Sequence, residues 1–295
     1  MTDQALPIEQ SIAREKLTRK PLIPLKHIPA YLFLGAWSLF TICALSWVVL
    51  ASLKTNREVF RQPFAIPAEP QFVNYERVWL SSQVGQAFIN SLVTVGTSVA
   101  LILAVSAPAA YVLSRGQFKG RGLLTMVYIA GIGIPYPLLF IPLFAILAGL
   151  KLLNSIPGLV LIYVSLSIPF TVYILTGFFS TLPKELEDAA VIDGANDFQV
   201  FWNVMLPLAA PGLITATIFN FIGLWNEFQL ALIFIQAPEL RPLSLSLYTL
   251  KNSMTYSGDW AGLFAGVVIV IVPTVALFIW LSERMISGMT LGSVK

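Results

Sequence analysis

The sequence predicts an all-α integral membrane protein with six transmembrane helices. Of its 295 residues, 57% are hydrophobic and 11% are charged, whereas about a quarter of the residues in a soluble domain are charged. About 20 apolar residues cross roughly 30 Å of hydrocarbon, and open strands would leave backbone groups unpaired in lipid. Six apolar runs meet this length and are expected to be helices: residues 29–51, 87–113, 123–147, 158–180, 211–235 and 261–282.

The first run, residues 29–51, follows a polar and basic segment of residues 1–28. The run is long and lacks a small-residue cleavage site, so we expect a retained helix rather than a cleaved signal peptide. With residues 1–28 inside, eleven of the 18 Lys and Arg residues fall in inner segments, most clearly before the first span and in the loop 114–121. Because basic residues favour the inner side, both termini, including the tail 284–295, are expected in the cytoplasm.

Residues 87–283 form the expected core of five further helices. Two longer segments, 52–86 and 236–260, are expected as outer loops, and each contains prolines and a tryptophan. Each is either a shallow surface for a soluble partner or a simple connector. Within the core, three prolines are expected to kink or break the third span: Pro135, Pro137 and Pro142.

Several polar side chains fall inside the predicted spans. Glu227 is the acid well inside the fifth span, with Asn220 seven residues earlier and Asn226 and Gln229 beside it. An acid at mid-membrane costs about 2.5–3.5 kcal/mol, so Glu227 is expected to face protein or water. Two interpretations stay open for this group, a path for a solute and polar contacts between helices.

Asn90, Thr94 and Thr97 share one face of the second span and allow the same two interpretations. Small residues recur every four positions at the start of the sixth span and predict close helix packing. They are Gly258, Gly262 and Gly266.

Composition and motifs also exclude several kinds of function. The sequence has no Gly-x-x-x-x-Gly-Lys-Ser/Thr phosphate loop, so an ATPase that drives this protein is expected to be another polypeptide. The single histidine, His27, and the single cysteine, Cys43, form no Cys/His cluster for a metal and no internal disulfide. No basic tract indicates nucleic acid. We therefore expect no catalytic residues, metal site or resident cofactor in this chain.

A polar island, residues 181–210, lies between the fourth and fifth spans and is expected to hold a partner. Pro183 is tolerated in a first helical turn, and the acids that follow suit the positive end of a helix dipole. Ala189 and Ala190 are small enough to let another surface approach the helix closely. Gly194 is expected to interrupt this helix, because glycine turns without a Cβ penalty.

The second half of the island predicts another short helix. Asn196, with Gln199 three residues later, resembles a helix cap, and Pro207 is expected to end the helix. Against Lys184 alone, the island carries five acids: Glu185, Glu187, Asp188, Asp193 and Asp197. This charge favours a partner surface with arginine or lysine, and a solvated amphipathic loop is the alternative.

The spacing within the island resembles a known family. Asp188-Ala189-Ala190 is followed by Gly194 and then by Val204-Met205-Leu206-Pro207. The pattern resembles the EAA loop of binding-protein-dependent ABC importer permeases, which reads Glu-Ala-Ala, three residues, Gly, nine residues, Ile, one residue, Leu-Pro. The sequence departs from it with Asp188 for Glu and Val204 for Ile. The carboxylate that would pair with an ATPase is therefore one methylene shorter at Asp188.

Three further segments resemble the maltose-type carbohydrate permeases, specifically their MalG-like half: Arg115–Arg121, Trp225–Phe228 and Ser287–Lys295. The resemblance implies the type I ABC importer permease (MetI-like) fold and a place in the bacterial inner membrane. It also implies a sugar substrate, a second MalF-like permease subunit, two ATPase subunits that bind ATP and Mg²⁺, and an external solute-binding protein. A permease for another solute, an ion-coupled secondary transporter and an intramembrane enzyme are the alternatives, although secondary transporters usually carry several intramembrane charges or paired repeats.

The resemblance also implies that the island is a coupling helix seated in a groove of one ATPase, and that Val204, Leu206 and Pro207 pack its second short helix under the bundle. The candidate coupling residues are Glu185, Glu187, Asp188, Ala189, Ala190, Asp193, Gly194, Val204, Leu206 and Pro207. The candidate residues of the translocation path are Asn90, Thr94, Asn220, Asn226 and Glu227.

Overall fold

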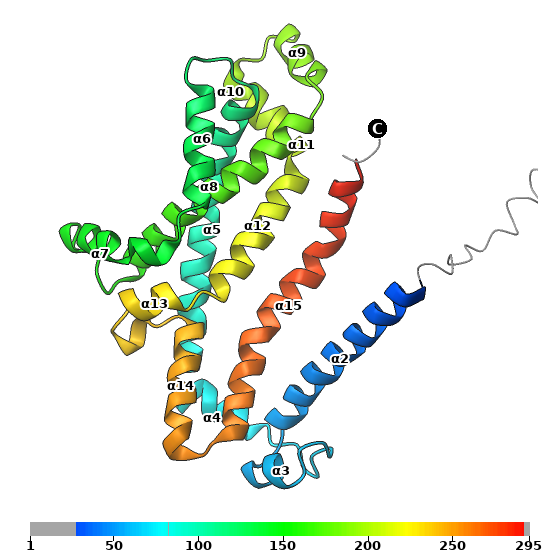
Figure 1. Ribbon diagram of the computed structural model, residues 1–295, viewed down its shortest axis with the longest axis vertical. Helices are drawn as coiled ribbons and strands as arrows, with labels where there is room; N and C mark the ends of the chain where they lie inside the picture. Colours follow the sequence, from blue (N-terminus) through cyan, green and yellow to red (C-terminus); the bar gives the residue numbers. More distant parts are fainter. Residues whose placement is uncertain (1–27, 82, 292–295) are drawn as a thin grey trace, which may run out of the picture. The chain divides into compact units, whose positions relative to one another are not determined.

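The computed structural model describes residues 28–81 and 83–291 (Figure 1). The expectations for residues 1–27, including His27, and for the last four residues of the tail therefore lie outside the described residues. The chain divides into two units, residues 1–48 and 49–295, and each is described by itself. In the first unit, residues 28–48 belong to α2 (Ile28–Ser52), a 25-residue apolar helix that covers the predicted span 29–51. At about 1.5 Å per residue this helix is long enough to cross a bilayer.

Three helices form the centre of the second unit. The long helix α5 (Val84–Arg115) packs along α8 (Ile156–Thr181), and α12 (Ala210–Trp225) packs against both. Small side chains on the buried face of α5, such as Ala107 and Ala110, let the neighbouring helices approach closely. The last long helix, α15 (Trp260–Leu291), packs on α12.

The third predicted span is broken, as its prolines predict. Helix α6 (Arg121–Ile132) is followed by the short helix η2 (Tyr136–Leu139) and by α7 (Phe140–Gly149), with a bend of 98° between the two parts. Pro135 lies in the break, where its missing N–H donor costs no helical hydrogen bond. Pro142 lies in the first turn of α7 and is tolerated there.

The fifth predicted span, 211–235, is wrong as a single helix. Helix α12 ends at Trp225, and a short helix α13 (Gln229–Phe234) follows after a break. In the described residues, four helices are long and apolar enough to cross a membrane, or six if each of two bent helix pairs counts as one span. All regular secondary structure in these residues is helical.

The two predicted outer loops contain helices of their own. Residues 52–86 hold α3 (Asn56–Arg61) and α4 (Val73–Ser81), and residues 236–260 hold η4 (Pro238–Leu240) and α14 (Leu243–Ser257). Helices α4 and α14 both pack on α5 and α15. These segments are therefore part of the packed bundle and are more than connectors.

The close packing predicted at the recurring glycines of the sixth span is only partly confirmed. A Cβ at Gly266 would lie 3.1 Å from Leu247 Cδ1 of α14, so the helices do approach closely there. Gly258 instead adopts φ +65° in the turn before α15 begins at Trp260. The prediction of close packing is wrong at Gly258, because this residue precedes the helix.

The island between α8 and α12 folds into four short helices: α9 (Glu185–Ile192), α10 (Asp197–Gln199), the π-helical η3 (Val200–Met205) and α11 (Leu206–Leu208).

Candidate functional site

Helix α9 begins the candidate coupling site and is largely exposed. Its first turn carries Glu185, Glu187 and Asp188, where the helix dipole favours negative charge. The helix ends at Ile192, and Gly194 turns the chain with φ +85°. The predicted interruption at Gly194 is confirmed, because few residues other than glycine adopt this backbone conformation without strain.

A capping box starts the second half of the island. Asn196 Oδ1 accepts a 2.9 Å hydrogen bond from the Gln199 N–H, and the Asn196 N–H donates one of 3.0 Å to Gln199 Oε1. The predicted cap is therefore confirmed. The predicted helix end at Pro207 is wrong, since helical structure continues to Leu208. The change from π to α geometry at Leu206 makes Pro207 the second residue of α11, where a missing N–H is tolerated.

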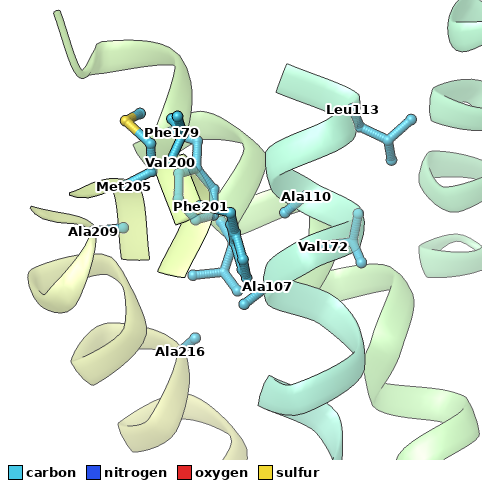
Figure 2. Close-up of a cluster of buried hydrophobic side chains, with 11 residues drawn as sticks. Ala107, Ala110, Leu113, Val172, Phe179, Val200, Phe201, Met205, Ala209 and Ala216 are labelled. Carbon is cyan, nitrogen blue, oxygen red and sulfur yellow. The ribbon is translucent and has the colours of Figure 1, made fainter. Parts of the chain in front are cut away.

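The second half of the island is anchored in an apolar cluster, which Figure 2 shows with Phe179 of α8 and Ala107 and Ala110 of α5. Phe201 and Met205 of η3 are buried in it, and the Phe201 ring lies 6.4 Å from that of Phe179, measured between ring centroids. The spacing of four residues between Phe201 and Met205 is typical of one helix face. These two anchors were not among the predicted site residues, although that spacing could have identified them.

The predicted packing residues of the island contribute less than these anchors. Val204 and Leu206 are half-buried against the same cluster, whereas Pro207 is exposed. The expectation that all three attach the island to the bundle therefore holds for Val204 and Leu206 and is wrong for Pro207, which faces away from the cluster.

The acids of the island do not all face outward. Glu187 Oε1 lies 3.1 Å from Arg115 Nε in an ion pair, with the two side chains 14% and 16% exposed. Asp188 and Asp193 are exposed, as are Glu185 and Ala189. The structure thus separates Glu187 from the acids that remain available to a partner.

Large apolar side chains accompany the exposed acids. Ile192 of α9 is 85% exposed, and Phe198 of α10 and Trp202 of η3 are exposed with ring centroids 5.9 Å apart. Helices α9 and η3 pack on each other, so these side chains belong to one structural unit. A surface with exposed aromatic and aliphatic groups is typical of a protein-binding site.

One of the predicted path residues, Asn90, holds an outer segment instead. Asn90 Nδ2 donates hydrogen bonds of 2.8 and 3.1 Å to the Glu239 and Arg241 carbonyls. Thr94, one turn further along α5, is also buried. This geometry supports the polar-contact interpretation for Asn90, which ties α5 to the segment before α14.

Asn220 likewise makes contacts between helices. It is 6% exposed, and its Nδ2 donates to Thr171 Oγ1 of α8 at 2.9 Å and to the Ala216 carbonyl at 2.8 Å. These contacts account for both amide hydrogens. The polar-contact interpretation therefore fits Asn220, and a path role does not.

Glu227 lies in the break between α12 and α13, so its predicted place inside a continuous span is wrong. Its carboxylate caps α13 by accepting hydrogen bonds from the N–H groups of Leu230 at 2.6 Å and Ala231 at 3.1 Å. It also accepts a 2.7 Å hydrogen bond from the Tyr163 hydroxyl. These three donors offset the cost of removing the carboxylate from water.

An open cavity of about 1070 Å³ adjoins this break and brings together groups from α6, η2, α8, α12 and α13. Asn226 and Glu227 line it, as does Gln229, whose Oε1 accepts a 2.8 Å hydrogen bond from the Tyr136 hydroxyl. Ser165 adds a further hydroxyl. Tyr136 and Ser165 were not predicted, since only the fold places them beside Asn226.

Comparison with known proteins gives the family. The model of the family described as "Binding-protein-dependent transport system inner membrane component" matches residues 96–286. The diacetylchitobiose uptake system permease protein NgcG of Streptomyces coelicolor is 36% identical over 88% of this chain and 86% of its own length. The probable ABC transporter permease protein YurM of Bacillus subtilis is 30% identical over 99% of this chain and 96% of its own. The sulfoquinovosyl glycerol transport system permease protein SmoH of Agrobacterium fabrum is 36% identical over 84% of this chain and 87% of its own.

Solved structures agree on the fold. A bacterial ABC transporter involved in the import of the acidic polysaccharide alginate superposes with a TM-score of 0.76 at 23% identity, covering 90% of this chain and 99% of the other. The MetNI methionine ABC transporter in an inward-facing form gives a TM-score of 0.56. The chain therefore has the type I importer permease fold and belongs to the family of binding-protein-dependent transport system inner membrane components, the permease subunits of ABC importers.

Proposed function

We propose that this chain forms half of the translocation path of an importer for a sugar or oligosaccharide. Relatives named for diacetylchitobiose, sulfoquinovosyl glycerol and trehalose support a carbohydrate as the solute. A second MalF-like permease completes the path, and an external binding protein delivers the sugar. Two partner ATPase subunits bind ATP and Mg²⁺ and carry out hydrolysis, so this permease subunit is not itself an enzyme. Both termini lie in the cytoplasm.

The observation that carries this proposal is that the island has one buried side and one exposed side. Its buried side, with Phe201 and Met205, is fixed in the bundle, whereas its outer side presents Asp188, Ile192 and Phe198. This arrangement suits a groove that is apolar and carries arginine or lysine. In the proposed mechanism α9 seats in such a groove, and closure of the ATPase pair turns the bundle as a rigid body.

The open cavity beside α13 supports the proposed path. Hydroxyl, amide and carboxylate groups of Ser165, Asn226 and Glu227 line it together with aromatic rings, and such a mixture of polar and apolar groups is typical of ligand sites. Sugars present many hydroxyls, which hydrogen bond to these groups in turn. Since the cavity is open, a neighbouring permease subunit would close it.

The coupling role is tested by co-purification of the ATPase. The complex is expressed with the unmodified chain, with Asp188→Lys or with Gly194→Pro, and the ATPase recovered with the permease is quantified in mild detergent. We expect both variants to insert normally and to lose most of the ATPase and of uptake. Lys119→Gln, which removes the charge of an exposed residue outside the island, is the control for a change of surface charge elsewhere. Unchanged recovery and uptake in both variants would refute the coupling assignment.

The solute is tested separately from the coupling. The binding protein encoded with this permease is purified, and the compound that it retains is identified by mass spectrometry. Uptake of that compound into proteoliposomes containing the full complex is then measured with and without internal ATP. A retained carbohydrate with ATP-dependent uptake supports the proposal, whereas a retained amino acid or anion, or uptake without ATP, contradicts it.

A further inference from the structure

One side chain at the end of α5 joins three elements of this permease. Arg115 is the last residue of α5, and its Nε lies 3.1 Å from Glu187 Oε1 of α9. Its Nη2 also donates hydrogen bonds to the Phe179 carbonyl at 2.7 Å and to the Leu182 carbonyl. These two carbonyls belong to the C-terminal end of α8, where the helix dipole favours a cation. The guanidinium therefore connects α5, α8 and α9 directly.

The corner after Arg115 is held by a second arginine. Arg121, the first residue of α6, donates from Nη2 to the Ser114 carbonyl at 2.9 Å and from Nη1 to the Gly116 carbonyl at 3.3 Å. Carbonyls at the end of a helix have no partner within it, so Arg121 supplies a donor for the Ser114 carbonyl in the last turn of α5. The backbone that carries Arg115 is thereby fixed on both sides.

Helix α9 depends on this ion pair more than the rest of the island does. No residue of α9 is fully buried, whereas η3 inserts Phe201 and Met205 into the apolar cluster. The turn at Gly194 separates the two helices. Among the described residues, Glu187 is the α9 side chain that forms an ion pair with the bundle. Breaking that pair would leave a largely buried charge without its partner, which is strongly unfavourable.

We infer that Arg115 is a positioning residue, which through Glu187 makes α9 move together with α5 and α8. The inference rests on the proposed function, in which α9 docks on the ATPase. Docking itself uses the exposed side of the island, so the two roles are carried by different side chains. Without the Arg115 guanidinium, α9 still docks but its movement is transmitted to the bundle only in part.

The test measures separately whether the ATPase stays attached and whether movement is transmitted between the bundle and the ATPase. The full transporter is purified with Arg115→Gln, Glu187→Gln, the double variant or Arg115→Lys. Lys119→Gln, which removes one positive charge as Arg115→Gln does, is the control. Each complex is reconstituted in proteoliposomes. The measurements are the ATPase recovered per permease, basal ATP hydrolysis, and the stimulation of hydrolysis by the binding protein carrying its co-purified solute.

We expect the two single variants to retain the ATPase and basal hydrolysis within about twofold and to lose most of the stimulation, at least fivefold. Because residues in contact act as a unit, the double variant should lose no more than the worse single variant. Arg115→Lys, which keeps the charge, should retain part of the stimulation. Lys119→Gln should behave as the unmodified protein.

Three results would overturn the inference. Full stimulation in both single variants would show that the pair transmits nothing. Independent, additive losses in the double variant would show that Arg115 and Glu187 do not act together. Loss of the ATPase from the single variants would show that the pair serves docking instead. Failure of the unmodified chain to recover any ATPase would refute the proposed function itself, and this outcome is distinct from the other three.

Discussion

The Tyr163 hydroxyl donates a 2.7 Å hydrogen bond to Glu227 Oε2 and so joins the middle of the bundle to the break between α12 and α13. Tyr163 is fully buried in α8. Glu227 also accepts hydrogen bonds from the N–H groups of Leu230 and Ala231 in the first turn of α13, and its carbonyl accepts one from the Ser244 hydroxyl of α14. The carboxylate thus fixes the one irregular point in the fifth hydrophobic segment, next to the open cavity.

We predict that Glu227→Gln lowers the free energy of unfolding by about 1–3 kcal/mol. The three donors bond to two carboxylate oxygens in the unmodified protein, whereas glutamine offers them only one acceptor oxygen. Tyr163→Phe, which removes a single donor, should cost about 1 kcal/mol. Thermal unfolding of the purified chain in detergent measures both. Uptake by Glu227→Gln should fall less than in Gly194→Pro or Asp188→Lys. An assembled Glu227→Gln complex with no uptake at all would instead show a direct role in the path.

The two phenylalanines of the island separate anchoring from docking. Phe201 is 6% exposed and Phe198 is 70% exposed. Phe201→Ala should destabilise the permease by about 3–5 kcal/mol, as is usual for a buried aromatic residue. Phe198→Ala should leave the thermal unfolding of the permease unchanged and should reduce recovery of the ATPase. Unfolding in detergent and quantitative co-purification distinguish them. The prediction fails if the two variants give the same pair of results.

Gly194 allows the cost of a backbone conformation to be measured without a steric clash. A Cβ built at this residue has no neighbour within 4 Å, and its φ is +85°. Gly194→Ala should therefore lower the stability by about 1–2 kcal/mol through the backbone alone. Gly194→Asn should cost less, since asparagine tolerates the left-handed region better. Equal losses in the two variants would point to contacts made by the added side chain in place of backbone strain.

Two asparagines near the C-terminal half of α12 should respond differently. Asn220 is buried and bonds to Thr171 of α8, whereas Asn226 lines the open cavity. Asn220→Ala should reduce stability by about 0.5–1.5 kcal/mol, in the range of hydrogen bonds between membrane helices, with KM for uptake unchanged. Asn226→Ala should raise KM with little effect on unfolding. A raised KM in Asn220→Ala, with Asn226→Ala unaffected, would reverse the assignment of these two residues.

Much of the island could be predicted from local sequence because its chemistry is local. The cap of Asn196 and Gln199 and the turn at Gly194 depend on residues within a few positions of each other, so the spacing in the sequence contains the necessary information. Pro207 shows where this approach fails. Its effect depends on the π-helical turn before it, and nothing local in the sequence indicates that turn.

The direction of individual side chains could not be predicted, because it depends on contacts between distant segments. Five acids in one island look equivalent in the sequence, yet Arg115, some 70 residues earlier, turns Glu187 inward. In the same way, Asn90 bonds to carbonyls about 150 residues later and is removed from the candidate path. Such pairings follow only from how α5 packs.

The amino-acid sequence by itself determines that this protein is a helical membrane protein, because apolar length is a property of short segments. The spacing of the island, which is equally local, gives its resemblance to the permeases of ABC importers. Only the tertiary structure decides which polar groups serve the bundle and which face a partner or the cavity. Arg115, Asn220 and Glu227 all satisfy their charges or amide groups across helices. The physical reason is that a buried polar group must find its partner wherever the fold places one, and the nearest partner in space is often remote in sequence.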